Sequence, residues 1–349
     1  MKKNLLTLFF AGLLTLSASA QQRVKTFPTL ERKATPAPLL APSANVPSAI
    51  NDKALGTKIF ATQVTDESKY RSWLYFYDTK PWELHRVNIF DNEVGMQNRG
   101  LLHGAWGGDK YYGYYGTMNN PGQSMEWRGF KGFVSLDVRT GQYEFTKDMQ
   151  EGLDNATVVW TYSYGDQGFP NIQDMTYNPV DENVYVTAKY QKDEKTDAVS
   201  RIYTVDKQTG DLQLVTELEE QILEFCFDYD GNMYIVTPYW KSNSDGTFNW
   251  SGTYLSVYDN NMNPIDGKKF RIKNSEKQDV LANGYGSLSF NYTTGDLYLT
   301  SLIAPTDGSS NYCRLVKLDP TSGKYLDSQT FMPGNQIIGL YIPYYTADS

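Results

Sequence analysis

The chain has 349 residues, 40% of them hydrophobic and 21% charged, which suffices for one large domain with a substantial apolar core. Lysine and arginine total 32 against 40 for aspartate and glutamate, a formal net charge of -8. An acidic chain without a basic stripe is poorly suited to bind nucleic acid or an anionic membrane surface. Two histidines and two cysteines leave little material for a His- or Cys-based metal centre or a disulfide scaffold.

Residues 1–20 have the pattern of a cleaved secretory signal peptide. A basic start precedes an apolar stretch from Leu5 to Leu16, and small residues ending at Ala20 form a cleavage site. This apolar run of about 12 residues is shorter than the roughly 20 that a membrane-spanning helix needs, and no later stretch is apolar enough to span. We therefore expect export to the periplasm, the cell surface or the medium, with a mature chain beginning at Gln21.

Residues 21–53 differ in composition from the rest of the chain. They contain five prolines among alanine, serine and threonine, without the periodicity of a packed element. Such a composition is typical of an extended leader or linker. Residues 54–349 are then predicted to form a single folded domain.

Within this domain, one unit recurs: an apolar strand that ends in aspartate, followed by a tight turn. The copies read LYFYDTKPW, VSLDVRTGQY, YTVDKQTGDL, LSVYDNNMNP and VKLDPTSGKY. Their aspartates are spaced by 59, 69, 53 and 60 residues and are Asp78, Asp137, Asp206, Asp259 and Asp319. An aspartate can accept bonds from backbone N–H groups two residues on, and Gly141, Gly210 and Gly323 can supply the left-handed position that closes the hairpin. These residues are predicted to have structural roles in turns.

A second unit precedes the first in each repeat. It reads MTYNPVDENVYVTAKY from Met175, FCFDYDGNMYIVTPYW from Phe225 and LSFNYTTGDLYLTSLI from Leu288, with a weaker copy, LLHGAWGGDKYYGYYG, from Leu101. Each copy is a strand, a polar turn and a β-branched or aromatic strand. Together the two units give four antiparallel strands, A to D, about every 60 residues. This is the pattern of an all-β β-propeller with four-stranded blades.

Five C-strand aspartates predict five blades. The first blade has strands GTKIFATQV, SWLYFYD and WELHRVNIF for B, C and D, but no A strand before them. We predict that the C-terminal IIGLYIPYY supplies this strand and closes the ring, since closure removes exposed sheet edges. Six or seven blades, with degenerate ones in the long connections, remain the alternative. Cys226 and Cys313 lie in apolar runs of different repeats and are expected to be free, buried thiols.

The strand NVYVTAKY and the D-x-x-T-G turns resemble the repeats of YVTN and quinoprotein-like propellers. The layout, a signal peptide and a Pro-rich leader before the repeats, resembles secreted propeller domains of Bacteroidetes-type bacteria. The resemblance covers about residues 54 to 344 and implies a propeller fold. It carries no catalytic residues across, and no pyrroloquinoline-binding constellation maps onto this sequence, so no cofactor is expected.

The strand order predicts which loops share a face of the disc. The A–B and C–D turns, all short, emerge on one side, and the B–C loops and D–A links emerge on the other, the long-loop face. The long segments are 116–129, 146–173, 191–200, 241–252 and 305–311. Long loops on a rigid scaffold are frequent binding sites.

Large aromatics concentrate in these segments, and aromatic rings in polar surroundings stack on sugars or anchor proteins. The predicted ligand-binding residues are Trp127, Trp160, Tyr162, Tyr164, Tyr239, Trp240 and Trp250, and Phe169 lies in the same segments. The alternative is that each of these rings packs between blades. The expected partner is a glycan or a protein.

Catalysis would need paired carboxylates near the axis, as in glycosidases. Asp174 and Glu224 are the inner-strand candidates, whereas the A strands of blades 1, 2 and 5 offer no matching acid. Asp228 begins a turn, and the stretch it starts lacks the later acidic positions of a calcium loop, so no metal site is predicted. The sequence thus favours a secreted, non-catalytic binding module. The alternatives are a glycan-active hydrolase or lyase that uses Asp174 or Glu224, and a structural cell-surface module.

Overall fold

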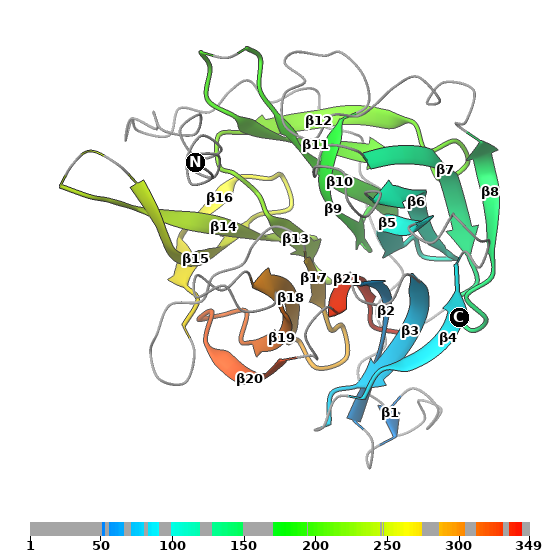
Figure 1. The fold of residues 1–349 in the computed structure, drawn as a ribbon. Coiled ribbons are helices and arrows are strands. Elements are labelled where there is room, and N and C mark those ends of the chain that lie inside the picture. The colour runs from blue at the N-terminus through cyan, green and yellow to red at the C-terminus, as the bar shows by residue number, and fades with distance from the viewer. Residues whose placement is uncertain are drawn as a thin grey trace, which may run out of the picture.

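Five sheets surround a common axis in the computed structural model of the chain (Figure 1). The structure describes residues 51–52, 56–65, 71–79, 83–90, 99–118, 128–148, 170–193, 195–244, 246, 248–273, 286–303, 312–330 and 335–343. All regular structure in these ranges is β, and the strands are numbered β1 to β21. The same ranges accordingly hold no long apolar helix of the kind that crosses a membrane.

Blades 2 to 5 are antiparallel sheets whose strands follow the chain from the axis outward. Blade 2 consists of β5 (Arg99–Trp106), β6 (Tyr111–Met118), β7 (Arg128–Leu136) and β8 (Tyr143–Asp148). Blade 3 consists of β9 (Asn171–Asn178), β10 (Asn183–Tyr190), β11 (Val199–Val205) and β12 (Leu212–Leu218). Blade 4 consists of β13 (Glu224–Phe227), β14 (Met233–Ser242), β15 (Phe248–Tyr258) and β16 (Pro264–Arg271). Blade 5 consists of β17 (Ser287–Phe290), β18 (Leu297–Ile303), β19 (Tyr312–Leu318) and β20 (Tyr325–Thr330).

Blade 1 is built from both ends of the domain. Its strands β2 (Gly56–Thr65), β3 (Ser72–Tyr77) and β4 (His85–Ile89) are consecutive, and the short β1 (Asn51–Asp52) pairs with the start of β2. The inner strand is β21 (Asn335–Tyr341), which pairs antiparallel with the rest of β2. This pairing confirms five blades and closure by the C-terminal strand.

The core lies between neighbouring blades, because alternate residues of each strand pack against opposite neighbours. In β14, Tyr234 and Val236 join the apolar cluster shared with Leu288 of blade 5. Met233 and Ile235 join the cluster shared with blade 3. Strands buried on both faces need β-branched and aromatic residues at every position, which explains why the repeats lack a polar alternation.

The two cysteines belong to these inter-blade clusters. Cys226 lies in the cluster between blades 4 and 5, and Cys313 lies in the cluster that joins blade 5 to blade 1. Both are free and buried, as the sequence predicts. Burial raises the pKa of Cys313 to about 12, so this thiol stays protonated at neutral pH.

The predicted turn chemistry is confirmed in the D-x-x-T-G hairpins. Asp137 Oδ1 accepts the N–H of Arg139, and Asp206 Oδ1 accepts the N–H of Gln208. Gly141 and Gly210 have φ of 68° and 72°, the left-handed conformation that glycine adopts without steric cost.

The turns of blades 2 and 3 also dock their blades onto the preceding ones. The Gly141 carbonyl accepts a bond from Asn88 Nδ2 at 2.8 Å, and the Gly210 carbonyl accepts one from the buried Tyr114 hydroxyl at 2.6 Å. Trp73 Nε1 donates to the Val138 carbonyl at 2.8 Å. The repeated turn therefore holds neighbouring blades together as well as closing its own hairpin.

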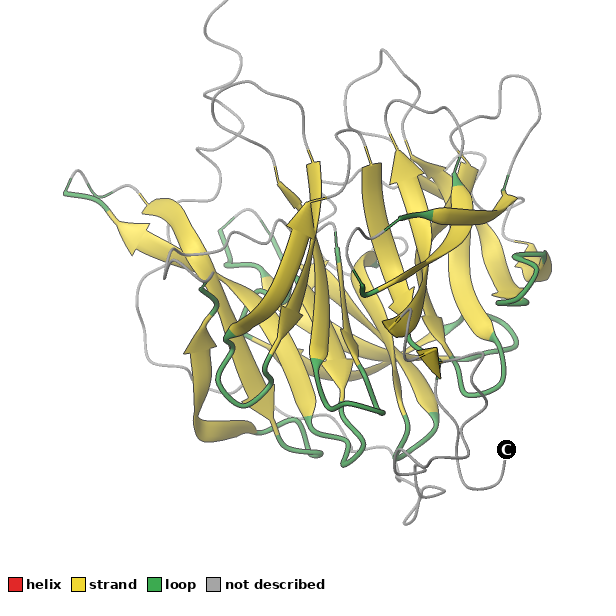
Figure 2. Cartoon of the chain, turned by 90° about the horizontal axis from the view of Figure 1, so that it is seen from below, coloured by secondary structure: helices red, strands yellow, loops and turns green. Residues whose placement is uncertain are grey.

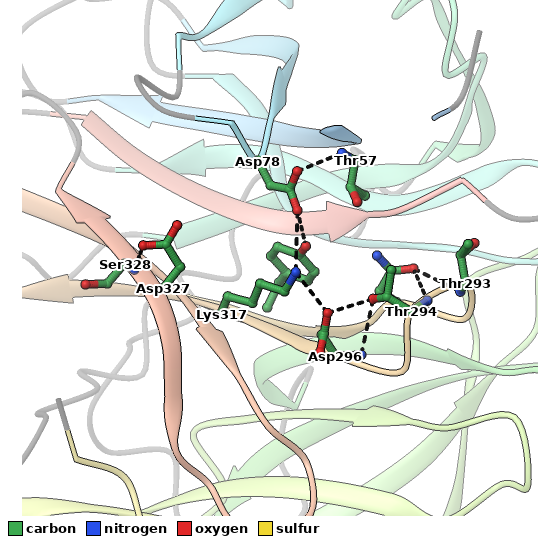
Figure 3. Close-up of polar contacts among 10 residues, drawn as sticks. Thr57, Asp78, Thr293, Thr294, Asp296, Lys317, Asp327 and Ser328 are labelled. Atoms are coloured by element: carbon green, nitrogen blue, oxygen red, sulfur yellow. Dashed lines mark hydrogen bonds and ion pairs between the residues drawn. The ribbon is translucent and has the colours of Figure 1, made fainter. Parts of the chain in front are cut away.

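Asp78 departs from the predicted turn role. Its Oδ1 accepts the Thr57 N–H at 2.7 Å, and its Oδ2 accepts the hydroxyl of Tyr298 from blade 5. Lys317 Nζ lies between Asp78 and Asp296, 3.8 Å and 2.9 Å from their carboxylate oxygens (Figure 3). Asp78 thus links blade 1 to blade 5, the two blades between which the ring closes.

Replacing Tyr114 with phenylalanine removes only the hydroxyl that reaches blade 3. Tyr114 is fully buried, so the Gly210 carbonyl would lose its partner in a dry environment. We expect Tyr114→Phe to lower the free energy of unfolding by about 1–3 kcal/mol, measured by urea denaturation. Tyr229→Phe, at a side chain 51% exposed, is the control and is expected to cost nearly nothing. Equal stability of the two variants would contradict this role of the turn.

Candidate functional site

The two faces of the disc differ as the strand order predicts. Tight A–B and C–D turns gather on one face, the short-turn face, at the lower edge of Figure 2. Of the aromatics predicted to bind a ligand on the opposite face, Trp127, Trp160, Tyr162 and Tyr164 lie outside the described residues, as does Phe169. The remaining three, in blade 4, fall within the described part of the chain.

Blade 4 carries a two-stranded ribbon that extends beyond its sheet and projects from the ring (Figures 1 and 2). β13 pairs with β14 only from Met233 to Val236, and the ladder of β16 with β15 ends at Tyr254. β14 and β15 nevertheless stay paired as far as Ser242 and Phe248. The expected loop at 241–252 is therefore wrong in extent, because residues 241–242 and 248–252 belong to the two strands. We call residues 239–242 and 248–252 the blade-4 ribbon.

Trp240 and Trp250 are directly paired across the blade-4 ribbon. A β-bulge lies between Tyr239 and Trp240, and the Trp240 side chain is half-buried. Directly opposed residues of an antiparallel pair share one face of the ribbon. The ladder register thus places the backbone of Trp240 directly opposite that of Trp250.

Tyr239 lies at the base of the ribbon, where a cation covers its ring. The Arg271 guanidinium carbon is 3.7 Å from the ring centre, and Tyr254 meets the same ring edge-on at 5.4 Å. Lys269 lies 5.1 Å from the Tyr254 ring and pairs with Glu220 at 2.7 Å. These contacts stiffen the base of the ribbon, and sequence reasoning missed their basic members on β16.

Asp174, on inner strand β9, joins the blades at the axis. Its Oδ1 accepts the N–H of Met175 at 2.9 Å, and its Oδ2 accepts those of Phe225 at 3.0 Å and Leu288 at 3.5 Å. Ser287 Oγ also bonds this carboxyl and accepts the Leu340 N–H of blade 1 at 3.3 Å. One carboxyl group therefore ties the inner strands of blades 3, 4 and 5, and the serine extends the connection to blade 1.

Burial raises the pKa of Asp174 well above its usual value, and the hydrogen bonds to its oxygens oppose that shift. Glu224 begins β13 and is fully buried. Its side chain packs against Gly286, because its Oε1 lies 3.1 Å from the position that a Cβ on this glycine would occupy. Both acids that the sequence offers for catalysis are thus enclosed by inner strands. Asp228 accepts the N–H groups of Asp230 and Asn232, as expected of a turn residue.

A small cavity lies among the inner strands of blades 1, 2, 3 and 5. A void of about 30 Å³ remains among residues of β5, β9, β17 and β21, including Trp106 and Tyr341. A space of this size holds about one water molecule. Across the described residues, His, Cys, Asp and Glu side chains form no group of three able to hold a metal ion.

No protein-family model matches the chain, and no curated protein matches it. Among solved structures, it is similar to TolB from Acinetobacter baumannii, with 15% identity, a TM-score of 0.35, and coverage of 79% of this chain and 53% of that one. It is also similar to a hypothetical selenium-binding protein from Sulfolobus tokodaii, with 8% identity, a TM-score of 0.42, and coverage of 84% and 94%. A third similar structure is the β-propeller domain of the Trilobed protease from Pyrococcus furiosus, with 12% identity, a TM-score of 0.27, and coverage of 69% and 59%.

The chain thus spans about half the length of the TolB chain. At these identities, no activity, ligand or partner carries over to it. The similarity concerns the propeller architecture.

Asp174→Asn tests whether this carboxyl acts as a link between blades. The amide would turn one acceptor oxygen into a donor that faces backbone N–H groups. We expect the free energy of unfolding to fall by about 1–3 kcal/mol at neutral pH. Asp230→Asn, in an exposed turn, is the control and should change little.

The pH dependence gives a second measure of the same variant. Because the Asp174 pKa is raised in the folded state, its contribution to stability is fully present below the unfolded pKa of about 3.9 and is lost as pH rises through the folded pKa. The difference in stability between the parent and Asp174→Asn should therefore shrink as pH rises from 3.9. A difference that grows over this window would contradict the direction of the shift.

Proposed function

We propose that the protein is an exported, non-catalytic recognition module whose long-loop face binds a glycan or a protein partner. The observation that carries this proposal is the direct pairing of Trp240 with Trp250 on a ribbon that projects from a closed ring. Aromatic anchors on a rigid support lose little conformational entropy on binding, which is why they dominate many recognition surfaces.

The support for the ribbon comes from contacts at its base. Arg271 covers Tyr239, and its Nη2 donates to the Ser251 carbonyl on the opposite strand at 3.2 Å. The Ile272 N–H bonds the Thr253 carbonyl at 2.9 Å. Strand β16 and the residue after it therefore hold both strands of the hairpin at the base of the blade-4 ribbon.

The setting of the axial acids favours binding over catalysis. A retaining or inverting glycosidase needs two carboxylates that face a substrate across several ångströms. Here the Asp174 oxygens accept backbone N–H groups from three inner strands, and Glu224 is fully buried. A hydrolase or lyase that uses these acids remains the alternative to be tested in the same assay.

Export is supported by the sequence of the first fifty residues. A basic start, a short apolar stretch and a small-residue site precede a proline-rich leader. We expect the chain recovered outside the cytoplasm to begin at Gln21, measured by N-terminal sequencing or intact mass. Recovery of a chain that retains residues 1–20 would contradict this prediction.

The binding prediction is tested by screening the chain from Gln21 to Ser349 against soluble polysaccharides and matrix glycoproteins. We expect a partner whose affinity falls about tenfold or more in the double variant Trp240→Ala/Trp250→Ala, since each anchor contributes roughly 1 kcal/mol or more. The control is Tyr229→Ala, an exposed aromatic on the short-turn face, which should bind as the parent does.

Product formation is followed in the same wells. Release of product by the parent chain, lost in Glu224→Gln, would overturn the non-catalytic proposal in favour of the hydrolase or lyase. Absence of binding in every well would instead support a structural surface module.

A further inference from the structure

A cleft of about 800 Å³ opens on the short-turn face beneath blade 2. Its walls include Trp106 at the end of β5, Leu136 at the end of β7, and Tyr143 at the start of β8. Lys110 of the A–B turn and Arg139 of the C–D turn lie at its rim. Pockets of this volume are typical of small-molecule sites. We call it the blade-2 cleft.

The A–B turn explains why the cleft lies at blade 2. In blades 3, 4 and 5, this turn begins with Asn178, Asp228 and Asn291, and each side chain accepts the backbone N–H two residues on. Blade 2 has Gly107 at this place, and its closing bond, from Gly107 N to the Lys110 carbonyl, spans four residues. The corresponding bonds span five residues in blade 4 and six in blade 5. The A–B turn of blade 2 is therefore shorter than those of blades 4 and 5, and its residues Asp109 and Lys110 line the cleft beside the C–D turn.

Packing around Gly107 fixes this short turn. A Cβ at Gly107 would stand 2.5 Å from the Tyr112 ring, so no larger residue fits without displacing that ring. Lys207 of blade 3 donates to the Gly107 carbonyl at 2.8 Å and lies 3.7 Å from Asp109. The turn is thus fixed from both sides.

The aromatic walls are fixed in the same way. The half-buried Trp106 stacks on Tyr341 of the closing strand, with ring centres 4.6 Å apart and planes 14° from parallel. Tyr143 stacks on Tyr115 at 4.9 Å and 25°. Rings held by a neighbour on one side present a pre-organised apolar surface, which lowers the entropy cost of binding.

We propose that the blade-2 cleft binds a short, uncharged oligosaccharide, with one sugar ring lying against Trp106. Sugar hydroxyls both donate and accept hydrogen bonds, and the cleft supplies both partners: Lys110 and Arg139 donate, and Glu144 accepts. This site lies on the face opposite the blade-4 ribbon and does not depend on the function proposed for that ribbon.

The charges around the cleft favour a neutral ligand over an ion. Asp137 is committed to the N–H groups of its own turn, and Asp109 accepts the Tyr112 hydroxyl at 2.9 Å. Together with Glu144, the cleft therefore has three carboxylates and two cationic side chains, Lys110 and Arg139. This nearly balanced set of charges gives little net attraction for a charged ligand of either sign. Stacking of a sugar ring and hydrogen bonding to its hydroxyls need no net charge.

The test is isothermal titration calorimetry of the purified protein with cellotetraose, maltotetraose, xylotetraose and mannotetraose. Trigalacturonate and tetraalanine serve as an anionic and a peptide comparator. Trp106→Ala removes the stacking wall, and Gln142→Trp fills the cleft from an exposed turn position. Gln208→Trp, at an exposed position of the corresponding turn in blade 3, is the matched control.

We expect at least one neutral tetrasaccharide to bind, with affinity lowered about tenfold or more by Trp106→Ala and by Gln142→Trp. Gln208→Trp should stay within about twofold of the parent. Binding that is lost in Trp240→Ala but kept in Gln142→Trp belongs to the long-loop face and not to the cleft. Should Trp106→Ala fail to fold, Gln142→Trp decides alone.

Three results would overturn the proposal. In the first, no neutral tetrasaccharide binds. In the second, binding is unchanged in the cleft-filling variant Gln142→Trp. In the third, trigalacturonate or tetraalanine binds more strongly than every neutral probe. Because Trp240→Ala affects only the opposite face, loss of cleft binding is distinguishable from failure of the proposed long-loop face.

Discussion

Closure of the ring by β21 is the constraint on which the rest of the structure depends. The strand completes blade 1 from the other end of the domain and occupies the edge of β2 that would otherwise be open. Its Gly339 carbonyl accepts the buried Tyr111 hydroxyl of blade 2 at 2.8 Å, and its Leu340 N–H reaches Ser287 of blade 5. The same strand places Tyr341 behind Trp106, so the wall of the blade-2 cleft exists only when the ring is closed.

The sequence predicts the architecture well because the blade is a local unit. Each turn that begins with aspartate and ends with glycine is formed by residues adjacent in the chain, and the missing A strand of blade 1 could be inferred by counting. The role of Asp78 could not be inferred, since its partner Tyr298 lies 220 residues away and belongs to the blade that the ring brings beside it. The prediction of a long loop in blade 4 was wrong in extent because the sequence NWSG lacks the alternation of apolar and polar residues typical of a strand. Its pairing with β14 nevertheless imposes an extended conformation.

The axial acids show the limit of sequence reasoning about chemistry. Asp174 and Glu224 were identified correctly as inner-strand acids, but their surroundings come from other blades. Two of the N–H groups that bind Asp174 belong to Phe225 and Leu288, which are 51 and 114 residues distant. A carboxyl whose oxygens are engaged by the backbone of its neighbours serves the assembly of the ring, and this distinction needs three-dimensional contacts.

The blade-2 cleft was missed for a different reason, since its signal in the sequence is a turn shorter than those of blades 4 and 5. LLHGAWGGDK is the weaker copy of its repeat because Gly107 replaces the Asn or Asp that caps the turn in blades 3, 4 and 5. The fold needs no glycine of positive φ at this place, but the Tyr112 ring lies 2.5 Å from where a Cβ on Gly107 would stand, so close packing within blade 2 explains the glycine. The turn that this glycine begins is shorter than those of blades 4 and 5, and its residues Asp109 and Lys110 line the blade-2 cleft. A departure of one copy from its repeat thus marks the place where the surface of the ring also differs.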